Sequence, residues 1–240
     1  MVIFMSDVYN ACVQNVREMT KQRKLLIRLL NNALKTGNTY EEEALTKIFA
    51  LLYSAYVESA FMKTINTPCG FNKSYIEQIM RCSNLESKWT ECIDLAFSKI
   101  ENANNKGEIA NKKQTIKRLM TKYIIEPSQI RNKIAHGQLK VALNSDCTRV
   151  NNDTTALLNK LDFVEIDKLF EIYDQFSQCI EDLIESPYKA HYLYFYPRLC
   201  NLQNYIEETE NYNRESKKKS LRESNKYINQ KARNTQLSNI

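Results

Sequence analysis

The chain has 240 residues, of which 43% are hydrophobic, so it can bury the core of one large domain or of one domain with an appendage. Only four glycines and four prolines occur, which is too few for the many turns of an all-β protein and favours long helices. The net charge is +6, and residues 212–240 account for all of it, with eight basic and two acidic residues. The basic balance therefore belongs to the C-terminal tail.

The cysteines and the hydropathy pattern exclude two classes of protein. Seven cysteines occur without a CxxC pair, and with only two histidines the chain is not expected to bind a structural zinc ion or another metal. No apolar run approaches the roughly 18 residues that cross a bilayer, so no membrane partner is expected. We expect reduced thiols, a cytoplasmic location and no cofactor.

Helical periodicity begins near the start of the chain. Apolar residues at intervals of three and four predict a first helix, which Gly37 and Asn38 end. A second helix is predicted from Tyr40 to Ile65, because its continuous apolar stripe is typical of a central core helix and its first turn is acidic. A further helical region follows from about Lys73 to Glu101.

The middle of the chain holds two predicted helices separated by a proline. One helix runs from Glu108 to Ile125 and is expected to stop at Glu126 and Pro127, since proline does not continue a helix. Proline can begin one, so a second helix is expected from Pro127 to His136, with Gly137 as a left-handed cap. Lys140 to Val150 lacks helical periodicity, and its alternation is compatible with a short hairpin.

The last clear core helix is predicted from Glu165 to Ser186 and ends at Pro187. The aromatic stretch from Tyr188 to Tyr196 is expected as a packed edge, with base stacking as the alternative. From Ile206 onward the apolar pattern fades, and the tail is expected to be exposed, disordered or bound to a partner. The prediction is an all-α fold with an N-terminal helix (residues 1–39), a helical bundle (40–200), a basic helical or disordered tail (201–240) and room for one short hairpin.

Arg131, Asn132 and His136 stand out in the helix predicted from Pro127 to His136. Asn132 and His136 share a helix face, and Arg131 lies about 140° from His136 but has a side chain long enough to reach the same end. Arginine offers a planar fork of donors to a phosphate, and histidine, with an ordinary pKa of about 6.5, transfers protons near neutral pH. These types suit metal-free RNA cleavage by the 2′-OH, although a solvated helix-end cation is the commoner explanation on residue types alone.

The six residues from Arg131 to His136 resemble the R-x4-H motif of HEPN domains, including the polar residue after the arginine. The stretch RNKIAHGQ, followed by Val141 to Asn144, is more closely similar to abortive-infection HEPN proteins of the AbiF type. A later helix with the sequence Ile180 to Pro187 resembles the same family, and the similarity spans roughly Tyr40 to Tyr196.

The resemblance implies a HEPN-type bundle that forms a homodimer and acts as a metal-independent endoribonuclease in phage defence or as a toxin of a toxin–antitoxin pair. Arg131 would bind the scissile phosphate, His136 would be the general acid or base or orient the 2′-OH, and Asn132 would support either group. The products would be a 2′,3′-cyclic phosphate and a 5′-OH. The partners would be substrate RNA and an antitoxin, which is either a small RNA or a protein.

Two alternatives stay open, a non-catalytic HEPN module that binds RNA or nucleotide and a helical adaptor without RNA affinity. Glu58 is expected as a boundary residue or a structural ion pair, with pairing to Arg131 as the alternative, because an unpaired buried carboxylate is costly. His191 has no arginine at motif spacing and is expected to be structural. Further RNA contacts are predicted for basic residues near the motif and in the tail, namely Lys133, Lys217, Lys218, Lys219 and Arg222.

Overall fold

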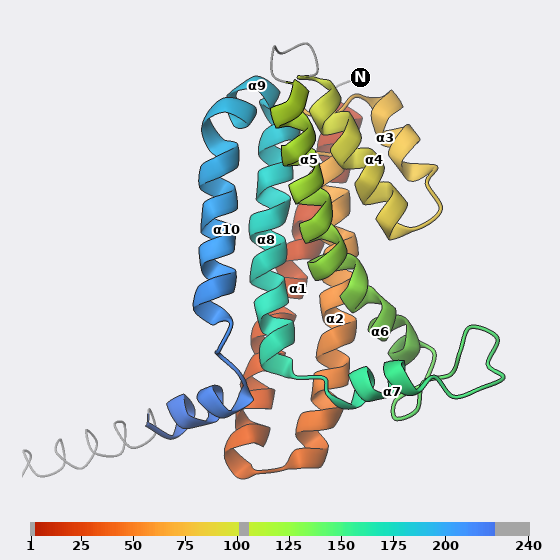
Figure 1. Ribbon diagram of the computed structural model, residues 1–240, viewed down its shortest axis with the longest axis vertical. Coiled ribbons are helices and arrows are strands. Elements are labelled where there is room, and N and C mark those ends of the chain that lie inside the picture. The colour runs from red at the N-terminus through yellow and green to blue at the C-terminus, as the bar shows by residue number, and fades with distance from the viewer. Residues whose placement is uncertain (1–2, 101–105, 224–240) are drawn as a thin grey trace, which may run out of the picture.

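The computed structural model in Figure 1 describes residues 3–100 and 106–223. Residues 224–240 of the predicted tail lie outside this part. Within the described residues the chain is helical without a β-strand, which confirms the all-α prediction. The segment expected as a short hairpin holds one isolated antiparallel bridge, between Leu143 and Val150. None of the described helices is long and apolar enough to cross a membrane.

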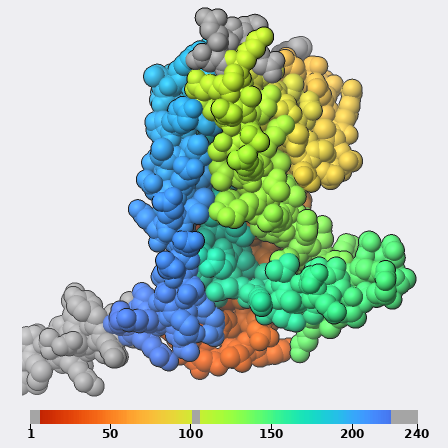
Figure 2. Space-filling view, in the orientation of Figure 1, coloured from red at the N-terminus to blue at the C-terminus, as the bar shows by residue number. Residues whose placement is uncertain are grey.

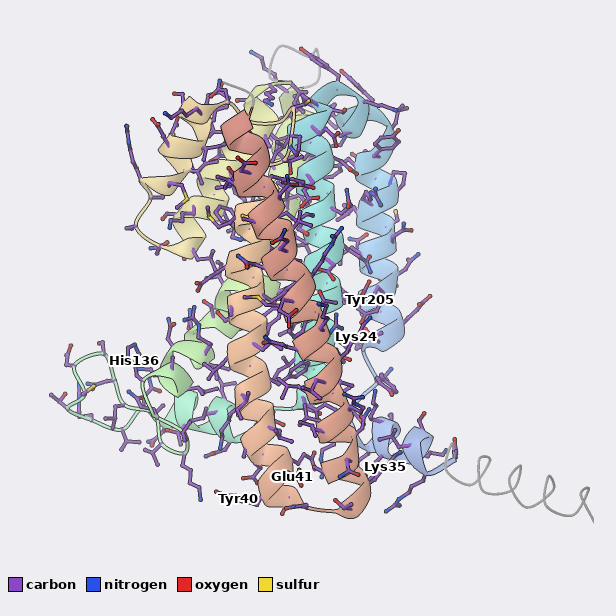
Figure 3. The ribbon with its side chains drawn as sticks, turned by 180° about the vertical axis from the view of Figure 1, so that it is seen from behind. Lys24, Lys35, Tyr40, Glu41, His136 and Tyr205 are labelled. Atoms are coloured by element: carbon purple, nitrogen blue, oxygen red, sulfur yellow. The ribbon has the colours of Figure 1, made fainter. Side chains whose placement is uncertain are left out.

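Four long helices run side by side along the molecule, with α5 across one face (Figures 1 and 2) and α1 on the opposite face (Figure 3). The four are α1 (Ile3–Thr36), α2 (Thr39–Ile65), α8 (Phe163–Glu185) and α10 (Phe195–Thr209). The predicted break after the first helix is confirmed, because Gly37 has a left-handed φ of +73°. Asn38 then caps α2 by accepting a hydrogen bond from the Glu41 amide.

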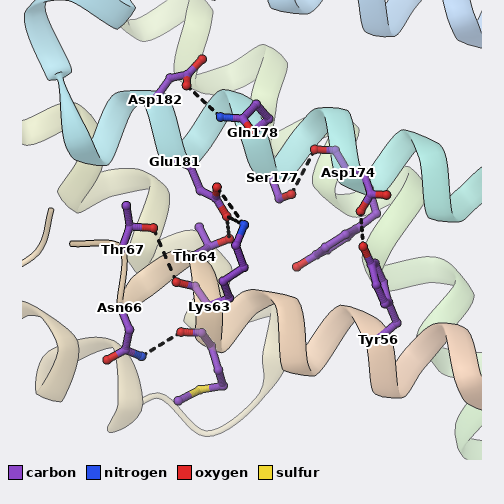
Figure 4. A network of polar contacts seen from close by, with 12 residues as sticks. Tyr56, Lys63, Thr64, Asn66, Thr67, Asp174, Ser177, Gln178, Glu181 and Asp182 are labelled. Carbon is purple, nitrogen blue, oxygen red and sulfur yellow. Dashed lines mark hydrogen bonds and ion pairs between the residues drawn. The ribbon is translucent and has the colours of Figure 1, made fainter. Parts of the chain in front are cut away.

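The core lies where α2 and α8 meet. Trp89 is fully buried there, with its ring 4.6 Å from that of Phe61 and 5.2 Å from that of Phe176. Figure 4 shows the polar side of the same contact, in which the Glu181 carboxylate accepts hydrogen bonds from Lys63 Nζ at 2.8 Å and Thr64 Oγ1 at 2.9 Å. A buried carboxylate is tolerated when it is paired in this way, so the network fixes the register of α2 against α8.

The helical region predicted from Lys73 to Glu101 is two helices, α3 (Lys73–Met80) and α4 (Leu85–Ser98). The prediction of one region missed the turn at residues 81–84. Asn84 begins α4 with a capping box, in which its side chain accepts from the Ser87 amide and Ser87 Oγ accepts from the Asn84 amide. Local capping therefore overrides the apolar periodicity here.

The predicted stop at Pro127 is wrong, because one continuous helix runs through it. This helix consists of α5 (Lys106–Met120), the π-helical turn η1 (Thr121–Ile125) and α6 (Glu126–Ala135). Pro127 has no N–H for the carbonyl of Tyr123, four residues earlier. That carbonyl instead accepts a hydrogen bond of 2.8 Å from the Tyr53 hydroxyl of α2. The wide π turn and this outside donor together allow the helix to continue.

After a loop and α7 (Asn152–Asn159), α8 ends before Pro187 as predicted. The single turn α9 (Pro187–Lys189) and the π turn η2 (Ala190–Tyr194) follow. The expectation of a packed aromatic edge is only half right. Ala190, His191 and Phe195 are buried, whereas the side chains on the other face of this stretch are exposed, namely Tyr188, Tyr192, Leu193, Tyr194 and Tyr196. The π turn widens the helix and so separates these two faces.

Candidate active site at the end of α6

The residues of the R-x4-H pattern lie in the last turn of α6. Gly137 has a left-handed φ of +76°, its amide donates to the Ile134 carbonyl at 3.0 Å, and the Gln138 amide donates to the Lys133 carbonyl at 2.9 Å. This pair of hydrogen bonds is the Schellman cap that a glycine at this position predicts. It ends the helix directly after His136, so the imidazole stands exposed at the outer end of α6 (Figure 3).

Ile134 sets which face of α6 meets solvent. Its side chain is buried against α2, and this orients the other side chains of the turn. Asn132 and His136, four residues apart, are both exposed on the outer face. The sequence-based expectation that these two residues share one accessible face therefore agrees with the geometry.

Arg131 turns toward α2 instead of toward His136. Its Nη2 donates to the Glu58 carboxylate in a short ion pair, so the alternative role for Glu58 is the one the geometry supports. The side chains of both residues remain partly exposed, by 27% for Arg131 and 54% for Glu58. Arg131 Nε is buried without a hydrogen-bond acceptor in the described residues. The guanidinium thus keeps unused donor capacity beside its carboxylate partner.

Lys133 is tied to the loop that follows the motif. Its Nζ donates to the Leu143 carbonyl at 2.6 Å, and the Leu143 amide donates to Gln138 Oε1 at 2.7 Å. The Asn151 amide closes the loop by donating to the Ala142 carbonyl at 2.8 Å. These contacts hold the loop against the end of α6. The predicted contact of Lys133 with RNA would have to coexist with, or break, its bond to Leu143.

An apolar groove of about 330 Å³ lies beside the motif, between α2 and the loop after α6. Ile48 and Leu51 of α2 form one wall, and Ile134 and Leu139 form the other. Ile48 and Leu139 are about half exposed, as is the nearby Val141. Exposed apolar surface of this kind often marks an interaction site.

The cations predicted in the tail lie away from the motif. Lys217, Lys218, Lys219 and Arg222 belong to a helical segment at residues 214–223, and Figure 3 places it across the lower end of the bundle from His136. Arg214 anchors the start of this segment through two hydrogen bonds to the buried Glu42 of α2, which raise the pKa of the guanidinium. The chain fold therefore does not bring the tail cations and the motif together.

His191 lies in a different environment, where sequence reasoning missed its partner. It is fully buried, and Lys112 Nζ of α5 lies 3.4 Å from its Nδ1 and donates to its carbonyl at 2.7 Å. Burial and the charge of Lys112 lower the pKa of His191. Lys112 also pairs with Glu108 at 2.7 Å, and this spacing of four residues was the one sequence signal of the cluster.

No group of three metal-ligating side chains is assembled within residues 3–100 and 106–223. Comparison of the chain with protein-family models, with curated proteins and with solved structures gave no match. The argument for function therefore depends on the residues themselves and on their geometry.

Proposed function

We propose that this chain is a HEPN-type endoribonuclease that cleaves RNA without a metal ion, as a toxin in anti-phage abortive infection or in a toxin–antitoxin pair. The observation that carries the proposal is the last turn of α6. An exposed imidazole, an exposed amide and an arginine with unused donors lie there within six residues, at the spacing of the R-x4-H motif. The all-helical fold is compatible with a HEPN bundle.

In the proposed reaction the 2′ oxygen of the RNA bonds to phosphorus while the bond from phosphorus to the 5′ oxygen breaks. The proton of the 2′-OH is removed and a proton is delivered to the leaving 5′ oxygen, which gives a 2′,3′-cyclic phosphate and a 5′-OH. His136 performs one of these transfers as general acid or base. Arg131 donates hydrogen bonds to the phosphate, and Asn132 supports the phosphate or the imidazole.

The proposed enzyme acts in the cytoplasm as a homodimer. The half-exposed apolar side chains around the groove between α2 and the loop after α6 support an association of two copies next to the motif. In the resting state a small RNA or protein antitoxin restrains the enzyme. Lys133 and the tail cations Lys217, Lys218, Lys219 and Arg222 serve as additional RNA contacts in this proposal.

A second candidate function is a non-catalytic module that binds RNA or nucleotide. The observation that favours it is the ion pair of Arg131 with Glu58, since a carboxylate on the phosphate-binding group opposes the approach of another anion. The two functions predict different results for the same variants. His136→Ala abolishes cleavage in the first case, and it leaves RNA affinity unchanged in the second.

The test is cleavage of labelled transfer RNA and total RNA by the purified protein in EDTA. We expect the native protein to produce cyclic-phosphate ends, and Arg131→Ala and His136→Ala to be inactive. Gln129→Ala is the matched control, because this side chain is exposed on the same helix outside the motif. Cleavage by all four proteins alike, or by none, removes the catalytic assignment; binding without cleavage favours the second candidate.

A further inference from the structure

A strip of exposed side chains runs along the whole continuous helix and ends at the motif. Exposed positions recur at steps of three or four residues, through the π turn and into α6. We call these residues the α5 strip: Asn111, Gln114, Arg118, Lys122, Glu126, Gln129, Asn132 and His136. Because the helix continues past Pro127, the outer faces of α5 and α6 form one surface that leads to His136 (Figure 2).

The α5 part of this surface is basic. Residues 106–125 contain six lysines and arginines but one acid, Glu108. A shallow groove of about 760 Å³ follows the helix here, with Lys113, Lys117, Arg118 and Lys122 among its lining residues. Asp94 of α4 holds Lys113 and Lys117 at 3.3 and 2.8 Å, so they are fixed at one edge of the groove. A row of cations along a groove suits a polyanion.

Arg118 and Lys122 are the groove cations best placed to bind a ligand. Both are exposed, and neither forms an ion pair with any residue in the described part of the chain. They are four residues apart and thus project side by side from the same face of α5. Two uncommitted cations at this spacing can contact phosphates of one strand without first breaking an internal salt bridge.

Exposed tyrosines adjoin α5 at the end remote from the motif. Tyr196 lies against α5, since Lys112 Nζ is 4.5 Å from the centre of its ring. Tyr188, Tyr192 and Tyr196 are each more than half exposed, so their rings are accessible from solvent. Unpaired bases stack on exposed aromatic rings, whereas bases in a duplex are already stacked on each other. An acidic protein segment would match the cations but would not need these rings.

We propose that the α5 strip, together with Tyr188, Tyr192 and Tyr196, is a binding track for single-stranded RNA that delivers the strand to His136. The choice of RNA rests on the proposed ribonuclease function, while the track itself rests on the cations, the tyrosines and the continuity of the helix. In this arrangement Arg118 and Lys122 hold phosphates midway between the tyrosines and the motif.

The test measures binding separately from cleavage. The probe is a fluorescein-labelled 2′-O-methyl oligouridylate, which lacks the nucleophilic hydroxyl and cannot be cleaved by the proposed route. The test variant is Arg118→Gln with Lys122→Gln. The matched control is Lys24→Gln with Arg28→Gln on α1, because this pair has the same charge, spacing and exposure and lies on the opposite face (Figure 3).

We expect the α5 variant to raise the Kd by about tenfold at low salt. The slope of log K against log salt should become shallower by about 1.4, which corresponds to the loss of two phosphate contacts on a single strand. The α1 control should bind like the native protein. A duplex of the same 2′-O-methyl chemistry should compete poorly.

Several outcomes overturn the track. These are the absence of binding by the native protein, equal loss in the α5 and α1 variants, or native affinity in the α5 variant. Equal competition by the duplex overturns the single-strand assignment. If native protein cleaves transfer RNA while the α5 variant binds normally, the track is wrong and the nuclease stands. If binding depends on Arg118 and Lys122 but no protein cleaves RNA, the track stands and the nuclease proposal fails.

Discussion

The two histidines of the chain lie in opposite environments, although each has a basic residue as a partner in its segment. His136 is exposed at the capped end of α6, whereas His191 is fully buried, with its Nε2 lacking a hydrogen-bond partner in the described residues. A polymer can reach the first ring but cannot reach the second. The comparison teaches that surroundings, and not residue type, separate an imidazole that can transfer protons to a substrate from one that packs the fold.

Replacement of His136 should give the largest effect on activity. We expect His136→Gln to lower kcat/KM for RNA cleavage by about 10²- to 10⁴-fold, because a glutamine cannot act as general acid or base. The free energy of unfolding in urea should change by less than about 0.5 kcal/mol, since the side chain is exposed. Native activity in this variant would break the proposed contrast between the two histidines.

Sequence alone could predict the helices whose apolar stripes face one core, such as α2 and α8, and the Gly137 cap, which depends on local chemistry. It could not predict that the helix continues past Pro127, because the donor that replaces the missing backbone bond comes from Tyr53, 70 residues away. The direction of Arg131 likewise depends on Glu58, 73 residues away. Pairings over such distances carry no periodic signal in the chain.

Removal of the partner of His191 should act on stability instead. We expect Lys112→Met to lower the free energy of unfolding by about 1–3 kcal/mol, because the buried carbonyl of His191 loses its donor. Lys113→Met is the control, and it should cost less than about 1 kcal/mol because its pair with Asp94 is partly exposed. Urea unfolding at neutral pH measures both. Equal effects of the two variants would contradict a special role for the buried amine.

Acidification should reveal the same difference through His191. Its pKa is lowered in the folded state, so the unfolded chain binds a proton more readily. The stabilisation by the neutral ring is therefore complete above the unfolded pKa of about 6.5 and decreases as the pH falls below it. The slope is at most about 1.4 kcal/mol per pH unit for one proton.

The measurement compares urea unfolding of native protein and His191→Gln at about pH 7.5 and about pH 5.5. Other groups titrate alike in both proteins, so the difference between the two isolates His191. The native protein should lose more stability on acidification than the variant. Identical pH dependence would show that the proton does not bind more readily in the unfolded state.

The smallest effect is expected from the carboxylate at the exposed site. Glu58→Gln should change the free energy of unfolding by less than about 1 kcal/mol, since its ion pair with Arg131 is partly exposed. RNA affinity should rise a few-fold, because Arg131 is released and a negative charge near the phosphate is lost. Glu43→Gln removes an equal charge from an exposed position of α2 and should have less effect on the Kd. Weaker binding by Glu58→Gln would instead make Glu58 a residue that positions Arg131.

The π turn η1 also sets the rotational phase of everything that follows it. It accommodates one residue more than an α-helical turn would, so deletion of a single residue between Thr121 and Ile125 would restore an ordinary helix. Each downstream side chain would then rotate by about 100° around the axis. Ile134 would leave the core, and Arg131 would lose Glu58. A change of length in this turn thus amounts to a change of identity at every position of α6, although no residue of the motif itself is replaced.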